Sequence, residues 1–100
     1  MSSKLESFLA AYLNQDWPDE YASADEAVAD FLSEGRSDEE LRAIQSEIDK
    51  LLARNQSSAE LERELLSRYQ CYYSPSADGM SADDWLRGIS AKFSEALVAN

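Results

Sequence analysis

Three short motifs in this chain each mark the start of a helix. Ser23 to Glu26, Ser37 to Glu40 and Ser57 to Glu60 all place a serine three residues before a glutamate. In this arrangement, the capping box, each side chain satisfies a backbone N–H group that the first helical turn leaves without a partner. Apolar residues at helical spacing follow each motif, so the sequence predicts a helix after each of the three serines.

The apolar spacing predicts five helices in all. They run from about Ser3 to Asn14, after Ser23 to a glycine cap at Gly35, from Ser37 to Asn55, from Ser57 to Tyr69, and after Ser81 to Leu97. The expected core positions are Leu5, Phe8, Leu9, Tyr12, Leu13, Ala24, Ala27, Val28, Phe31, Leu32, Leu41, Ile44, Ile48, Leu51, Leu52, Leu61, Leu65, Leu66, Tyr69, Trp85, Leu86, Ile89, Phe93 and Leu97. No segment alternates apolar and polar residues long enough to predict a strand. The sequence therefore predicts an all-α fold, a compact single-domain bundle of about five helices over residues 1–100.

The two longest predicted connections between helices contain aromatic residues. Pro18 disfavours helical geometry at Trp17, so a break is expected at residues 15–18. We expect Trp17 to fill the join between the first two helices. Tyr72 and Tyr73 lie in the long connection from 70 to 80, where both a packing role and a binding role are open.

Nothing in the sequence indicates export or membrane insertion. The longest uninterrupted apolar run, Phe8 to Leu13, has six residues, whereas about 20 are needed to span a bilayer. The single cysteine, Cys71, has no internal partner for a disulfide, and we expect it to be a small buried residue. We therefore expect a cytoplasmic protein.

The residues that common catalytic and metal sites require are largely absent. The chain has no histidine and one cysteine, which excludes Cys/His zinc sites and Ser-His-Asp or Cys-His catalysis. It also has no glycine-rich phosphate loop. Its many carboxylates leave an acid–base pair or a magnesium site open, although such clusters are usually solvated faces. We expect a protein that is not an enzyme and that needs no cofactor or metal ion.

The acidic residues are concentrated in one quarter of the chain. The net charge is −11, and the segment from Asp16 to Glu40 holds ten carboxylates against the single cation Arg36. A chain of this charge repels nucleic-acid phosphates and anionic membranes and attracts basic surfaces. Acidity that serves only solubility would be spread more evenly, so the clustering favours a basic partner.

The helix after Ser23 carries three of these carboxylates on one face. Glu26, Asp30 and Glu34 stand four residues apart, where like charges destabilise a helix by a few tenths of a kcal/mol per pair. Because these three carboxylates are present despite their mutual repulsion, we infer that this face of the helix has a binding role. The predicted partner-binding residues are Asp16, Asp19, Glu20, Tyr21, Asp25, Glu26, Asp30, Glu34, Tyr72 and Tyr73.

A set of short segments spread over most of the chain is typical of one protein family. They are Phe8 to Trp17, Tyr21, Phe31-Leu32, Ile48 to Leu52, Cys71 to Tyr73, Pro75 and Asp84 to Leu86. Through these residues the chain resembles the immunity proteins of contact-dependent growth inhibition systems (CdiI type). The most specific of these is Gln15-Asp16-Trp17.

The resemblance implies a cytoplasmic antitoxin that binds the C-terminal toxin domain delivered by a neighbouring bacterium and blocks it. Many such toxins are nucleases with basic substrate-binding surfaces, which agrees with the charge argument. The expected partner is thus one cognate toxin domain, bound 1:1 by a monomer, with no nucleic acid or membrane. Two alternatives stay open, namely an acidic nucleic-acid mimic and a helical adaptor that binds a basic host protein.

Overall fold

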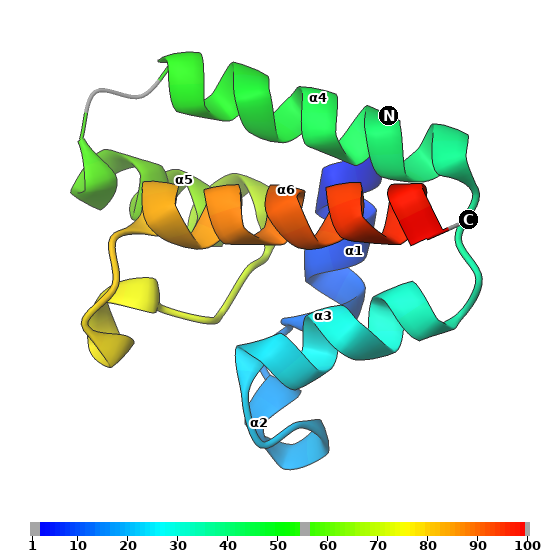
Figure 1. Ribbon diagram of the computed structural model, residues 1–100. Coiled ribbons are helices and arrows are strands. Elements are labelled where there is room, and N and C mark those ends of the chain that lie inside the picture. Colours follow the sequence, from blue (N-terminus) through cyan, green and yellow to red (C-terminus); the bar gives the residue numbers. More distant parts are fainter. Residues whose placement is uncertain (1–2, 55–56, 100) are drawn as a thin grey trace.

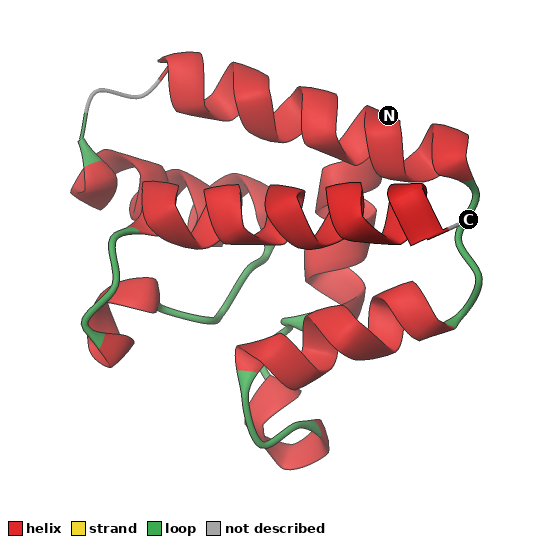
Figure 2. Ribbon diagram, in the orientation of Figure 1, coloured by secondary structure: helices red, strands yellow, loops and turns green. Residues whose placement is uncertain are grey.

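The computed structural model describes residues 3–54 and 57–99 as helices joined by loops, with no strand among them (Figures 1 and 2). The elements are α1 (Lys4–Tyr12), α2 (Trp17–Glu20), α3 (Ala24–Ser33), α4 (Asp38–Arg54), α5 (Ser58–Tyr69), the 3-10 helix η1 (Pro75–Asp78) and α6 (Ala82–Ala99). This confirms the predicted all-α fold, with five long helices and the short α2 in addition. The predicted end of the third long helix at Asn55 lies outside the described residues.

α1 and α6 organise the packing of the other helices. Each of them contacts α3, α4 and α5. In Figure 1, α4 runs above α6, α1 passes behind them, and α3 lies below, so that α2 and α3 are on the side of the molecule opposite α4. One core cluster takes side chains from all five long helices, and Leu13, Cys71 and Tyr73 join it from the loops.

The predicted caps form, but only in part as capping boxes. Ser23, Ser37 and Ser57 each accept the backbone N–H of the glutamate three residues later, at 3.1–3.2 Å. The glutamate side chains make other contacts than the one the motif predicts. The Glu26 carboxylate accepts the N–H of Ala22, at 2.7 Å, and the Glu60 carboxylate accepts the Ser57 hydroxyl, at 3.2 Å. Gly35 adopts the predicted left-handed conformation (φ +75°) after α3.

The predicted break is present at Gln15 and Asp16, but its predicted extension over Trp17 and Pro18 was wrong. Trp17 begins one turn of helix, and Pro18 occupies its first turn. A proline is tolerated there because the missing N–H would have no helical partner and the fixed φ suits the turn. Trp17 packs edge-on against Tyr73, with ring centroids 5.6 Å apart, and the N–H of Tyr72 donates to the Leu13 carbonyl at 2.7 Å. These contacts hold the 70–74 segment against the join between α1 and α2.

One expected core residue is exposed. Leu66 of α5 has 48% of its surface accessible, whereas Leu61 and Leu65 of the same helix are buried. Leu66 stands next to Leu65 in sequence and therefore projects about a quarter turn further around the helix. The prediction of burial at Leu66 was wrong because this side of α5 stays open to solvent over about half of the Leu66 surface. Tyr12, Leu32, Leu52, Tyr69 and Leu97 are partly buried at the edge of the core.

No helix among the described residues is both long enough and apolar enough to cross a membrane.

Candidate partner-binding surface

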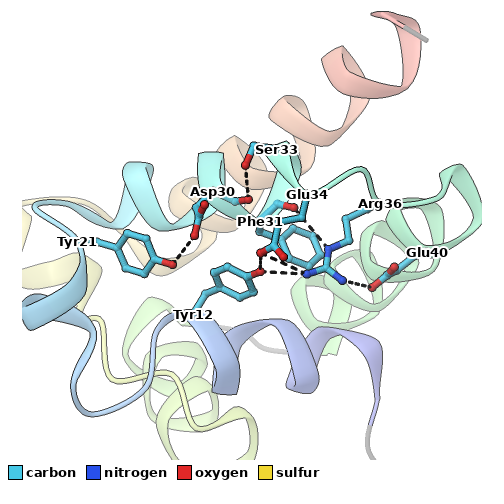
Figure 3. Close-up of polar contacts among 8 residues, drawn as sticks. All are labelled: Tyr12, Tyr21, Asp30, Phe31, Ser33, Glu34, Arg36 and Glu40. Carbon is cyan, nitrogen blue, oxygen red and sulfur yellow. Dashed lines mark hydrogen bonds and ion pairs between the residues drawn. The ribbon is translucent and has the colours of Figure 1, made fainter.

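α2, α3 and the residues beside them present a set of exposed carboxylates. Its members are Asp16, Asp19, Glu20, Asp25, Glu26, Asp30 and Glu34, all exposed, and we call them the acidic surface. Every acidic residue predicted to bind a partner belongs to it. Part of this surface, with the side chains that hold it, is drawn in Figure 3.

The alternation of residue types along α3 creates the exposed ridge. Ala24, Ala27, Val28 and Phe31 point into the core, at the three- and four-residue spacing of one helix face. Asp30 lies on the opposite, solvent-facing side. The apolar face thus fixes the orientation of α3, and this orientation turns its carboxylates outward.

A tyrosine holds Asp30 in place. The Tyr21 hydroxyl donates to the Asp30 carboxylate at 2.6 Å, across the turn between α2 and α3 (Figure 3). This hydrogen bond is the main reason that the pKa of Tyr21 is raised above its ordinary value of about 10, and burial adds to the shift. Tyr21 therefore stays a neutral donor at physiological pH, and its hydroxyl holds the Asp30 carboxylate in a defined position.

A second tyrosine and the single cation of the acidic segment hold Glu34. Tyr12 of α1 donates its hydroxyl to the Glu34 carboxylate and accepts a hydrogen bond from Arg36 at 3.0 Å. Arg36 lies 3.7 Å from Glu34 and 3.8 Å from Glu40, and its guanidinium stacks 4.4 Å from the centroid of the buried Phe31 ring (Figure 3). Burial, followed by the bond to Glu34, raises the pKa of Tyr12. The network links the end of α3 to α1 and α4.

The remaining carboxylates fall into two groups. Asp25 pairs with Lys92 of α6 at 2.8 Å, and Glu26 is occupied with the α3 cap. The side chains of Asp16, Asp19 and Glu20 accept no hydrogen bond and form no ion pair within residues 3–54 and 57–99. The carboxylates at α2 are therefore free for an external cation, whereas those of α3 are held in place by neighbouring side-chain or backbone groups.

The two tyrosines predicted from the long loop differ in exposure. Tyr72 is 46% exposed, but Tyr73 is only 7% exposed and packs between Trp17 and Trp85. The Tyr73 hydroxyl donates to Asp78 at 2.7 Å, and burial is the main cause that raises its pKa. The Tyr73 ring thus belongs to the core and leaves little surface for a partner.

Tyr12 and Arg36 are parts of the surface that sequence reasoning did not select. Tyr12 was expected in the core, and its position at the edge of the apolar stripe was the only sign that its hydroxyl could reach solvent. Arg36 was noted only as a lone cation. Its hydrogen bond to Tyr12 joins residues 24 positions apart in the chain, which no local pattern reveals.

The described part of the chain contains no group of three or more histidine, cysteine, aspartate or glutamate side chains placed to hold a metal ion. The exposed carboxylates form a negatively charged surface, and negative charge attracts cationic groups.

Comparisons with known proteins identify the family of the chain. A sequence model described as CdiI immunity protein matches residues 2–93. The crystal structure of a CdiA-CT/CdiI complex from Y. kristensenii 33638 contains a chain that is similar to this one, with a TM-score of 0.80 and 31% identity over 91% of each chain. No protein with a curated description matches. These matches confirm the resemblance seen in the sequence, and the chain belongs to the CdiI immunity protein family.

Proposed function

We propose that this protein binds the CdiA-CT toxin domain of its own growth-inhibition system and neutralises it by covering a basic substrate-binding surface with the acidic surface. Two findings support binding to a toxin domain, namely membership of the CdiI family and similarity to a chain in a CdiA-CT/CdiI complex. The observation that carries the binding mode is the exposed acidic surface on α2 and α3.

The chemistry of the acidic surface fits a nuclease as the target. A nuclease attracts phosphates with lysine and arginine side chains, and the carboxylates would occupy the positions of those phosphates. The excess negative charge speeds the diffusional encounter with a basic protein. The carboxylates of Asp30 and Glu34 are already positioned before binding, so less conformational freedom is lost when the complex forms.

A CdiI immunity protein is an inhibitor and not an enzyme, as the sequence predicts. We place its action in the cytoplasm, where a delivered toxin would find its substrates. One monomer would bind one toxin domain, with an interface of the standard size, about 1,600 Å² in total.

The proposal is tested by calorimetric titration into the catalytically inactivated toxin domain of the same locus. The test variant is D30N/E34Q, because Asn and Gln remove the charge but keep an oxygen for Tyr21 and Tyr12. The matched control is D49N/E95Q, which removes the same charge from exposed positions on α4 and α6.

We expect saturable nanomolar binding by the wild type that weakens with salt, and a loss of about tenfold or more for D30N/E34Q but not for D49N/E95Q. If both variants lost affinity equally, the effect would come from net charge, and the acidic surface would have no specific role. Absence of wild-type binding would refute the assignment of the toxin domain as partner.

A further inference from the structure

A groove lies beside the acidic surface, between α5 and the segment from 71 to 74. It has a volume of about 560 Å³, which is within the range of pockets that enclose bulky groups. Its lining consists of Ala59, Glu62, Arg63, Leu66, Cys71, Tyr72, Tyr73 and Ser74. None of these residues belongs to the acidic surface, so the groove is a separate feature.

Two large apolar side chains stay exposed on the walls of this groove. Leu66 is 48% and Tyr72 46% accessible, and both are among the few large apolar residues exposed anywhere in residues 3–54 and 57–98. Single exposed apolar residues need no explanation, but two that face one concave site, with charged residues at its rim, mark a site of interaction. The floor is formed by the buried Cys71, where loss of hydration raises the thiol pKa to about 12 and keeps it neutral.

The groove is held open by contacts that do not depend on a ligand. The N–H of Tyr72 is bonded to the Leu13 carbonyl on one side. On the other, Ser74 and Ser76 both donate to the Glu62 carboxylate of α5, the latter at 3.1 Å. These bonds fix the 71–74 segment relative to α5 and α1, so the walls are formed before any partner arrives.

The surroundings of the groove indicate which kind of molecule it binds. Tyr73 is one of the lining residues, and its buried ring contacts Trp17 on the core side. Trp17 begins α2, whose neighbouring carboxylates Asp16, Asp19 and Glu20 have no partner in the described structure. A segment that enters the groove therefore lies next to unneutralised negative charge. A second copy of this chain would bring its own net charge of −11 and be repelled, whereas a basic protein would be attracted.

We infer that the groove receives a bulky apolar side chain of the toxin domain, from a segment whose neighbouring lysine or arginine residues bind the carboxylates of α2. This inference rests on the proposed function and adds an apolar anchor to it. Interfaces commonly take most of their affinity from such buried anchors, while peripheral charges accelerate association. The groove would thus slow dissociation, and the acidic surface would speed association.

The test compares L66A, Y72A and L66R with wild type in binding to the inactivated toxin domain at low and moderate salt. Both positions are exposed, so the variants should fold, and thermal unfolding checks this. The control is V98A, at an exposed apolar position near the far end of α6. Sedimentation of the free protein at increasing concentration tests for self-association.

We expect about tenfold weaker binding or more for Y72A and L66A through faster dissociation, a larger loss for L66R, and no effect for V98A. The dependence on salt should be unchanged, because no acidic residue is altered. If the wild type binds tightly and all three variants bind equally tightly, the groove inference is overturned and the proposed function stays intact. If the free protein self-associates and L66R abolishes this association, the groove binds a second copy of the chain, and the inference of a toxin side chain is overturned as well. Failure of the wild type itself to bind would refute the proposed function and, with it, this occupant.

Discussion

At the scale of single residues, the acidic surface depends on uncharged side chains as much as on carboxylates. Tyr21 and Tyr12, whose rings stack 6.5 Å apart, donate to Asp30 and Glu34. A carboxylate that accepts such a bond has fewer accessible positions than one on a free side chain. Its ion pair with a partner then requires less ordering.

Replacement of Tyr21 by Phe tests this positioning role. Y21F leaves the net charge unchanged, so the association rate should stay the same, and dissociation should become about three- to tenfold faster. A double-mutant cycle with D30N measures the coupling between the two side chains. The unfolding free energy should change by about 1 kcal/mol or less, because the hydrogen bond is exposed to water.

Strictly additive effects of Y21F and D30N would contradict the positioning role, and so would a reduced association rate alone. Surface plasmon resonance with the inactivated toxin domain gives both rates.

At the scale of helices, the features encoded locally were predictable from sequence, and those that depend on distant contacts were not. The caps at Ser23, Ser37 and Ser57 and the apolar stripes depend on residues within one or two turns. The helical turn at α2 was missed because the Trp17 ring finds a place against Tyr73, more than 50 residues later.

The same distinction applies to the candidate binding surface. Its carboxylates could be selected from charge clustering, because the orientation of α3 follows from its apolar stripe. The bonds from Tyr12 and Tyr21, the cation–π contact of Arg36 and the exposure of Leu66 could not. Each of these depends on how separate elements pack, which a periodicity in one segment does not contain.

Removal of the α3 cap should lower stability without a direct effect on the acidic surface. Ser23 accepts the Glu26 N–H at 3.2 Å, and S23A should reduce the unfolding free energy by about 1 kcal/mol, measured by urea denaturation. The control is S46A, at an exposed site in α4, where alanine should be neutral or slightly stabilising. If S23A matched S46A, the serine would not stabilise the start of α3.

At the scale of the whole molecule, raised pKa values make the fold sensitive to alkali. The pKa values of Tyr21 and Tyr73 are raised in the folded state, and that of Cys71 rises to about 12. In the unfolded chain, the thiol loses its proton near pH 8.5 and the phenols near pH 10. Above these values the folded state binds more protons than the unfolded state, so the free energy of unfolding falls as pH rises.

Urea denaturation at pH 8, 10 and 11 should therefore show progressive loss of stability. Y73F should lose less between pH 10 and 11 than the wild type, because one titrating group has been removed. Unfolding free energies that are constant or increase over this range would contradict the assigned environments of these groups.

The charge of the whole molecule is also asymmetric. Ten of the twenty carboxylates lie in residues 16–40, and seven of these ten form the acidic surface. α2 and α3, which carry this surface, lie on the side of the molecule opposite α4 (Figure 1). Such asymmetry orients an approaching basic protein before contact. The effect of the acidic surface on toxin binding should therefore be distinguishable by experiment from the effect of net charge alone.

The measurement that tests this account most directly is carboxyl footprinting of the protein, free and bound to the inactivated toxin domain. Carbodiimide-activated labelling, read by mass spectrometry, reports the accessibility of each carboxylate. The account predicts that Asp16, Asp19, Glu20 and Asp30 lose most of their labelling in the complex, while Asp49 on α4 keeps its own. Unchanged labelling of the acidic surface in a saturated complex, or protection at Asp49 instead, would contradict the claim that α2 and α3 cover the toxin.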